Sequence, residues 1–214
     1  AEALSLRRDK FGEKHYAVAS SLNNYGVLQC NIGRYNEAEK SFMQAASILT
    51  DNGADATMQR AIISNNQAML YQAVGRYEEA EKVLLQAIAT AEKLQSSKSK
   101  NHLKFLSNLA LLYQHTKKYK EAEAIYAGME KRLGKNSPDL AAMLNNQAAL
   151  YLEMNREDNV EDLLKRSVNI YKSNFGEDNP AYVKSLSDLA NFYRYKTRYA
   201  EAEPLMEKTL TAYQ

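Results

Sequence analysis

Apolar residues recur at intervals of three and four, the spacing of one face of an α-helix, in segments separated by short polar turns. Ser-Pro at 137–138 and Asn-Pro at 179–180 each place a helix-capping residue before a proline suited to the first helical position. Gly33 and Gly75 follow two of the apolar segments, as glycine does at helix ends. Nothing in the pattern alternates as a strand does. It therefore predicts an all-α protein.

One ten-residue motif occurs five times at near-constant spacing. The copies are GRYNEAEKSF (33–42), GRYEEAEKVL (75–84), KKYKEAEAIY (117–126), NREDNVEDLL (155–164) and TRYAEAEPLM (197–206). Successive copies lie 42, 42, 38 and 42 residues apart. Each period holds two helix-patterned segments, and a lone pair of helices has no partner for its apolar face. The sequence thus predicts an α-solenoid of stacked antiparallel helix pairs.

The repeats divide the chain into one domain of consecutive units. The predicted boundaries are 1–16 for the end of a preceding repeat and its loop, then 17–58, 59–100, 101–137, 138–179 and 180–214 for repeats one to five. Because residues 1–16 resemble the end of a repeat, we expect the chain to start inside one and to come from a longer protein.

The fourth repeat departs from the others. Its turn lacks the glycine, and Glu157 stands where the other copies have tyrosine. The segment before it is four residues short, about one helical turn. We expect a different local turn there or a slight change in the pitch of the superhelix. Pro204 falls inside a predicted helix, and we expect it to be tolerated near the helix start.

Two sets of aligned positions describe the packing. A small residue in each first helix allows close approach, and a large residue in each second helix fills the space beside it. The small set is Gly26, Ala68, Ala110, Ala148 and Ala190, and the large set is Phe42, Leu84, Tyr126, Leu164 and Met206.

These positions match the tetratricopeptide repeat, although the usual period is shorter, at about 34 residues. The segment VASSLNNYGVLQCNIGRYNEAEKSF (18–42) is similar to the kinesin-light-chain-like subclass. The resemblance covers 17–214. It implies a right-handed superhelix with a concave groove and a non-catalytic role in protein–protein interaction.

Asparagine pairs in the first helices are the main candidate site. Helical geometry puts the second member of each pair roughly opposite the small residue that packs on the partner helix, so it faces the inner wall. This set is Asn24, Asn66, Asn108 and Asn146, closed by Asp188, and Asn65 and Asn145 belong to the first-member set. The resemblance implies that such amides contact the backbone of a bound peptide. Alternatively, they tie adjacent repeats together.

Other residues share the predicted inner wall. Met69 and Leu111 give it an apolar floor, and Lys104 and Lys184 give it a mildly basic rim. The remaining candidates are His115, Asn191 and Tyr195. We expect a partner segment with an apolar anchor and some acidic residues. Ordinary solvation is the competing explanation for the lysines.

Composition narrows the function classes. The net charge of +2 gives no reason to expect a nucleic-acid partner, and no apolar run reaches the ~18 residues of a membrane span. Cys30 is the only cysteine, which fits the reducing cytoplasm. No phosphate loop, nucleophile elbow or metal-ligand spacing occurs. We therefore expect no enzyme activity, cofactor or metal.

A further regular set is acidic: Glu39, Glu81, Glu123, Glu161 and Glu203. Its presence in every repeat indicates a structural role, such as charge at a helix start or pairing between repeats.

The leading hypothesis is a scaffold that binds an extended peptide of a partner protein in the concave groove. One alternative is a regulatory or sensory region of a larger signalling protein, controlled by a peptide or a neighbouring domain. The other is an architectural array that self-associates through its terminal repeats.

Overall fold

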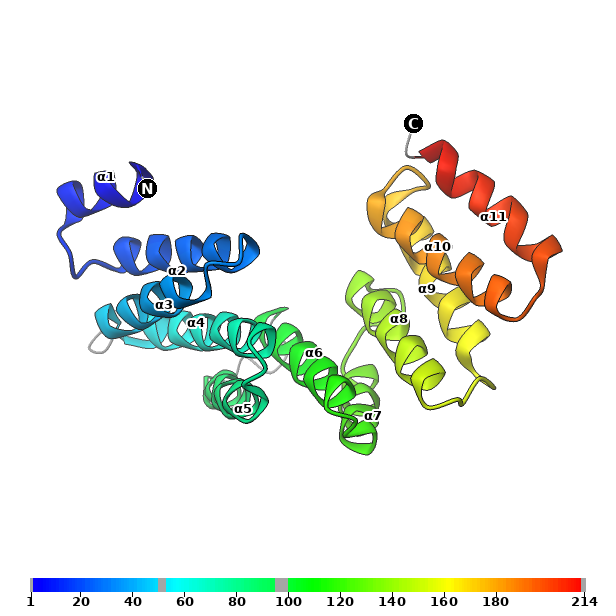
Figure 1. Ribbon diagram of the computed structural model, residues 1–214, viewed down its shortest axis with the longest axis horizontal. Helices are drawn as coiled ribbons and strands as arrows, with labels where there is room; N and C mark the ends of the chain where they lie inside the picture. The colour runs from blue at the N-terminus through cyan, green and yellow to red at the C-terminus, as the bar shows by residue number, and fades with distance from the viewer. Residues whose placement is uncertain (1, 50–52, 95–99, 213–214) are drawn as a thin grey trace. The chain divides into compact units, whose positions relative to one another are not determined.

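The computed structural model describes residues 2–49, 53–94 and 100–212, which fold into eleven α-helices with no strand (Figure 1). Their bounds are α1 Glu2–Phe11, α2 Tyr16–Asn31, α3 Tyr35–Ile48, α4 Gly53–Ala73, α5 Tyr77–Lys93, α6 Lys100–His115, α7 Tyr119–Glu130, α8 Pro138–Glu153, α9 Val160–Phe175, α10 Pro180–Tyr195 and α11 Tyr199–Ala212. The all-α prediction is confirmed. Helix α4 begins before residue 59, where the second repeat was predicted to start.

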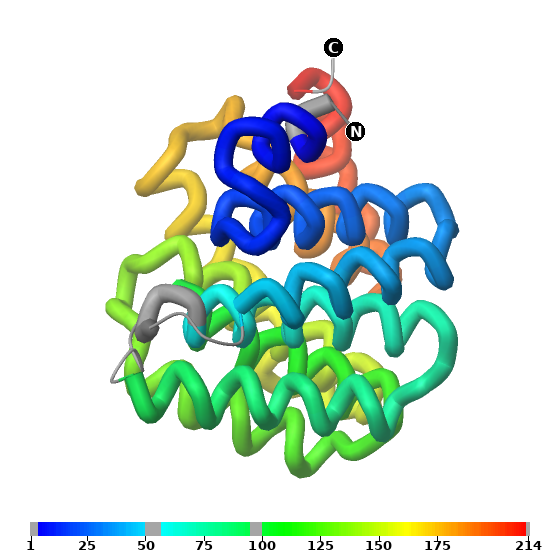
Figure 2. Tube along the Cα trace, turned by 90° about the vertical axis from the view of Figure 1, so that its left-hand side faces the viewer, coloured from blue at the N-terminus to red at the C-terminus, as the bar shows by residue number. Residues whose placement is uncertain are grey.

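The chain forms two compact units, 1–116 and 117–214. In the first unit, α2 packs on α3 and α4 on α5, and α3–α4 and α5–α6 contacts join them (Figure 2). In the second unit, α8 packs on α9 and α10 on α11, and α9 contacts α10. Short turns within the pairs and contacts between successive pairs are the arrangement that the repeat pattern predicts.

The turn inside each pair uses one residue with a positive φ. Gly33 and Gly75 adopt φ of 77° and 78°, as predicted for helix-ending glycines. Lys117, Asn155 and Thr197 take the same place with φ of 59°, 54° and 56°. The left-handed conformation is therefore kept where the sequence lacks glycine. It is least favourable for Thr197, because its side chain is β-branched.

Two helix starts confirm the predicted caps. Ser137 Oγ accepts a hydrogen bond from Leu140 N at 3.1 Å, and Asn179 Oδ1 accepts one from Ala181 N at 2.9 Å. A proline follows each of these residues at the first helical position, where its missing N–H has no helical partner to lose.

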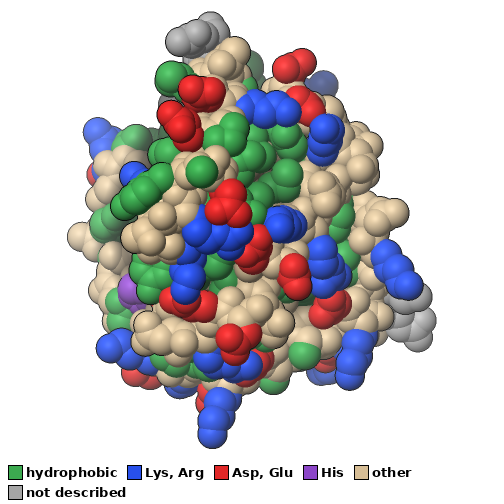
Figure 3. Space-filling model, turned by 90° about the vertical axis from the view of Figure 1, so that its right-hand side faces the viewer, with side chains coloured by type: hydrophobic (Ala, Val, Ile, Leu, Met, Phe, Trp, Pro, Cys, Tyr) green, Lys and Arg blue, Asp and Glu red, His purple; other side chains and the backbone are tan. Residues whose placement is uncertain are grey.

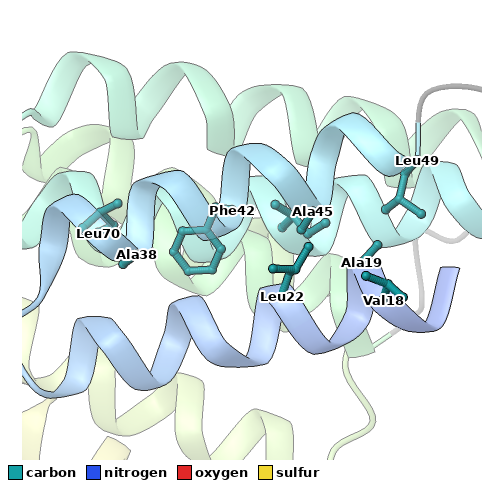
Figure 4. Packing of buried hydrophobic residues seen from close by; sticks show 9 residues of the cluster. Val18, Ala19, Leu22, Ala38, Phe42, Ala45, Leu49 and Leu70 are labelled. Atoms are coloured by element: carbon teal, nitrogen blue, oxygen red, sulfur yellow. The ribbon is translucent and has the colours of Figure 1, made fainter. Parts of the chain in front are cut away.

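The core of the first unit shows why the small positions are small. Val18, Leu22, Phe42 and other buried side chains of α2, α3 and α4 meet there (Figure 4). A Cβ atom on Gly26 would lie 2.7 Å from Cε1 of Phe42. The ring therefore occupies the space that a side chain on Gly26 would need.

The fourth repeat keeps the turn residue of positive φ, at Asn155, and differs instead in the start of its second helix. Four second helices begin at the tyrosine of the repeated phrase, whereas α9 begins three residues later than Glu157, at Val160. The helix before this repeat, α7, has 12 residues against 17 in α5. Pro204 lies inside α11, which continues through it.

Candidate functional site

The asparagines of the first unit bond to one another across neighbouring helix pairs. Asn66 Nδ2 donates to Asn23 Oδ1 at 2.9 Å, and Asn108 Nδ2 donates to Asn65 Oδ1 at 2.7 Å. Asn65 and Asn66 are also buried, with 1% and 8% of their surfaces exposed. In this unit the amides connect α2 to α4 and α4 to α6, which is the tie between repeats considered as the alternative interpretation.

The other candidates of the first unit are more accessible. Met69 and Leu111 are exposed, and so are Asn24, Lys104 and His115. The His115 Nε2 atom lies 2.9 Å from the Tyr77 hydroxyl in a hydrogen bond, and the two rings meet edge to face. His115 therefore has a polar partner within its own unit.

The candidates of the second unit surround a hollow of about 430 Å³ on α8, α9 and α10. Its polar lining consists of Asn145, Asn146, Lys184, Asp188, Asn191 and Tyr195. Its apolar lining consists of Ala148, Ala149, Leu152, Leu164 and Phe192. A few polar groups placed around an apolar base are typical of small binding sites. All six predicted site residues of this unit lie around one hollow.

The two charges of the hollow neutralise each other. Lys184 Nζ and Asp188 Oδ2 are 2.9 Å apart, one helical turn from each other on α10. Asn145 Oδ1 accepts a hydrogen bond from Ser185 Oγ at 3.3 Å. Within the described residues of the second unit, the side chains of Asn146 and Asn191 make no hydrogen bond to another residue. These two amides are therefore available to a ligand.

Some residues of the site were not among the sequence candidates. Leu152, Leu164 and Phe192 form the base of the hollow, and Asn23 is an acceptor in the first unit. Phe192 is the only large aromatic at its aligned position, where the other repeats have leucine. That difference was a signal available in the sequence, whereas the depth between α8 and α10 was not.

The acidic set pairs between repeats, as predicted for a structural role. Every glutamate of this set except Glu203 accepts a hydrogen bond from a tyrosine or an arginine of the following helix pair. The bonds are Arg76–Glu39 at 2.9 Å, Tyr113–Glu81 at 2.8 Å, Tyr151–Glu123 at 3.2 Å, Arg156–Glu123 at 3.0 Å, Tyr193–Glu161 at 3.0 Å and Arg198–Glu161 at 2.6 Å. Hydrogen bonds from Arg198 and Lys165 lower the pKa of Glu161 to about 2.

Within residues 2–49, 53–94 and 100–212, no three His, Cys, Asp or Glu side chains gather as metal ligands would. None of the described helices is both long and apolar enough to cross a membrane. Burial raises the pKa of the Cys30 thiol, which disfavours its reactive thiolate form.

The helix pairs, the left-handed turn residue and the small-against-large packing define a helical repeat protein. The family model described as tetratricopeptide repeat matches residues 59–127 and 139–214, and a second model of the same description matches 19–48. The chain belongs to the tetratricopeptide repeat family, whose members act as scaffolds for protein–protein interaction. No curated protein sequence matches it.

Solved structures share the fold. BtubC (BKLC) from P. vanneervenii has a TM-score of 0.77 at 20% identity, over 99% of this chain and 85% of that one. A Podospora anserina putative kinesin light chain with nearly identical repeats has a TM-score of 0.69 at 24% identity, over 92% and 96%. Aspartyl phosphate phosphatase F from Bacillus subtilis has a TM-score of 0.66 at 12% identity, over 93% and 60%. The likeness to kinesin-light-chain-like repeats is confirmed.

Proposed function

We propose that this protein is a non-catalytic interaction module that binds an extended segment of a partner protein on α8 and α10. The hollow of the second unit carries this proposal, because it combines an apolar base with amides that are not used within the fold. An amide can donate and accept at once, so Asn146 and Asn191 suit the N–H and C=O groups of a peptide backbone. Pockets between such groups select side chains.

The predicted asparagines have two different roles. Asn66 and Asn108 hold neighbouring helix pairs together in the first unit, and we assign no ligand contact to their amides. Asn146 and Asn191 contact the partner, and Leu152 and Phe192 receive one of its apolar side chains. Since Lys184 is paired with Asp188, the hollow favours an apolar anchor more strongly than an acidic one. This refines the sequence-based expectation of acidic residues in the partner.

The test selects peptides on the intact chain from a displayed library of random 12-residue segments. Affinities of selected peptides are then measured by calorimetry for the natural chain and for Asn146→Ala, Asn191→Ala and Phe192→Ala. Each substitution is expected to weaken binding by about fivefold to a hundredfold, since a lost hydrogen bond or anchor contact costs about 1–3 kcal/mol.

Asn31→Ala is the matched control, because Asn31 is an exposed asparagine near the end of a first helix in the other unit. Circular dichroism checks that each variant stays folded. Selected peptides that bind all variants equally would contradict the assignment of the hollow, and failure to select any peptide would contradict the proposed function.

A further inference from the structure

Two exposed residues are exceptions at their aligned positions. Leu28 of α2 is 53% exposed, whereas Leu70, Leu112, Leu150 and Phe192 at the same place are at most 5% exposed. Met206 of α11 is 40% exposed, whereas Phe42, Leu84, Tyr126 and Leu164 are at most 4% exposed. The inner members of both sets are buried in the core, and Leu70 and Phe42 belong to the same cluster.

Inside the chain, the two surfaces that Leu28 and Met206 represent pack against each other. Leu70 lies on the surface that α4 turns toward the preceding pair, and Phe42 lies on the surface that α3 turns toward the following one. Figure 4 shows both side chains in that shared core. Leu28 and Met206 therefore mark the two complementary halves of one repeated contact, one on each unit.

The polar groups of that contact are also present on the two surfaces. Arg34 aligns with Arg76 and Arg198, which bind the glutamates of the preceding pair. Glu203 aligns with those glutamates and is exposed. Arg34, which directly precedes α3, makes a 3.8 Å ion pair with Glu37 in the first turn of that helix, equivalent to the Arg76–Glu79 and Arg198–Glu201 pairs. Those pairs coexist with the bond to the preceding glutamate, so Arg34 can bind a second carboxylate.

The amide position follows the same logic. Asn24 aligns with Asn66 and Asn108, which donate to the asparagine of the preceding pair, and Asn24 is exposed. The acceptor position at the other surface is Ser187, whose hydroxyl oxygen can accept a hydrogen bond. Apolar, ionic and amide elements of the contact thus occur as matching halves.

Around Met206 the surface of α10 and α11 is hollowed. A space of about 460 Å³ is lined by Arg194, Tyr199, Ala202, Glu203, Met206, Glu207 and Leu210. Figure 3 views the side of the molecule where α10 and α11 lie, and hydrophobic side chains gather there between acidic and basic ones. An apolar floor edged by Glu203 and Glu207, with Arg194 beside them, suits a helix that presents Leu28 and is followed by Arg34 in the next turn.

Helix α1 leaves the matching half of α2 open. Arg7 binds Ser21 Oγ at 2.8 Å and the Ala17 carbonyl at 3.2 Å, both in the first half of α2. Asn24 and Leu28, in the second half, remain exposed. Helix α1 ends at Phe11 before Gly12, as α9 ends at Phe175 before Gly176, so in the register of the repeats the start of α1 corresponds to the last turn of α11. Because α1 already occupies that place on α2, a docked copy would use the first half of α11.

We propose that copies of this chain associate head to tail, with the second half of α2 from one copy seated on α10 and the first half of α11 from another. Arg34 then binds Glu203, Asn24 donates to Ser187, and Leu28 packs against Met206. Because the two surfaces differ, every copy that joins leaves one surface free for another, so the contact can repeat and builds open chains or closed rings of copies. It covers only half of a helix, so it is weak and depends on concentration.

The test is sedimentation velocity at increasing protein concentration, with Glu203→Arg and Arg34→Glu variants. The natural chain is expected to form species larger than dimers as concentration rises. Each single charge reversal is expected to weaken association by about tenfold or more, because it places like charges opposite each other. Glu78→Arg and Arg132→Glu reverse exposed charges elsewhere and should leave association unchanged.

Mixing the two variants gives the sharpest outcome. The arginine introduced by Glu203→Arg can face the glutamate introduced by Arg34→Glu, and the unchanged Arg34 and Glu203 of the two variants can also meet. Opposite charges then face each other wherever the two variants alternate, so the mixture should regain the large species that each variant alone has lost. A natural chain that stays monomeric at all concentrations would overturn the proposal. Association that survives both reversals, or variants that fail to associate when mixed, would also overturn it in favour of a different contact between copies.

Discussion

Single residues decide the shape of the turns inside the helix pairs. The left-handed position holds glycine in the first two pairs and lysine, asparagine or threonine in the others. The backbone conformation is the same in all five, so neighbouring helices and not the residue itself impose it. Residues with a side chain carry a conformational cost there, of about 1–2 kcal/mol.

Thr197→Gly is therefore expected to raise the free energy of unfolding by about 0.5–1 kcal/mol. Glycine relieves the strain of the left-handed conformation, but its greater freedom in the unfolded chain offsets part of that gain. Urea unfolding followed by circular dichroism measures the change. Gly33→Thr is the reverse experiment at an equivalent turn and should destabilise by a similar amount. A loss of stability in Thr197→Gly would show that the threonine side chain contributes more than its backbone costs.

Tyr126 has a hydroxyl group buried without a hydrogen-bond partner in the described part of the chain. Burial raises its pKa, in keeping with a dry environment. Tyr126→Phe removes an unsatisfied polar group and should raise the unfolding free energy by about 1 kcal/mol. Tyr193→Phe is the matched control, because its hydroxyl donates to Glu161 at 3.0 Å and its loss should lower stability. Equal effects of the two substitutions would contradict this explanation.

The stability of the first unit also depends on the absence of a Cβ atom at Gly26. Its Cβ would overlap the Phe42 ring, so Gly26→Ala should lower the unfolding free energy by about 1–3 kcal/mol through overpacking. The double variant with Phe42→Leu should recover part of this loss, because the smaller side chain leaves room for the added methyl group. Thermal unfolding of the two variants measures both effects, and a neutral Gly26→Ala would count against close packing here.

Between elements, the recurring contact is a glutamate held by the tyrosine and arginine of the next helix pair. In the second unit, Tyr193 and Arg198 of the last pair hold Glu161 of α9. The arginine also stacks on the tyrosine ring, with 4.5 Å between the guanidinium carbon and the ring centroid. One carboxylate thus fixes two side chains and links α9 to the last pair.

This contact makes stability depend on pH in a defined direction. The folded state lowers the pKa of Glu161 from 4.5 to about 2, so its contribution is fully present above pH 4.5 and is lost as the pH falls toward 2. Glu161→Gln should therefore be less stable than the natural chain at neutral pH, and the difference should shrink through this window. Glu207→Gln, an exposed control, should show no such dependence in urea unfolding across the pH range.

At the scale of the whole molecule, the asparagines fall into two groups: those that hold neighbouring helix pairs together and those that line the hollow of the second unit. Asn66 loses a bond to Asn23 when substituted, and Asn23 is itself buried. Asn66→Ala should therefore lower the unfolding free energy by about 1–2 kcal/mol. Asn146→Ala removes an amide at the hollow and should change it by less than about 0.5 kcal/mol. Unfolding curves of both variants measure the difference, and equal losses would contradict the division.

Much of the fold followed from the sequence because each feature recurs. Five copies of the turn phrase, the small residue at Gly26 and the caps at Ser137 and Asn179 all point to the same helix pairs. Local helix propensity and the packing between helices favour the same structure, so the fold of such a chain can be predicted from its sequence. The departure of the fourth repeat was visible at Asn155 and Glu157, but the sequence did not show that it would take the form of a later start of α9.

The site was only partly predictable. Helical geometry placed the asparagines on one face, but it could not tell which amides a neighbour would use. Whether an amide bonds to a neighbouring pair depends on the distance between the helices of adjacent pairs. Asn66 lies within hydrogen-bond distance of Asn23, at 2.9 Å, whereas Asn146 lines a hollow. The pairing of Lys184 with Asp188 likewise depends on rotamers that a residue pattern does not specify.

The bonds between pairs also restrict the order in which the pairs can be stacked. In the first unit, the first helices of neighbouring pairs are joined by bonds between asparagine amides, whereas Ser185 of α10 binds Asn145 of α8 and Ser167 of α9. Ile63 stands at the position equivalent to Ser185, within an apolar core. A permuted chain with the last pair placed directly after the first, in the position of α4 and α5, would bury the Ser185 hydroxyl in that core without its partners. The hydrogen bonds between pairs are therefore specific to the native order of the pairs. This specificity disfavours misassembled and domain-swapped arrangements during folding.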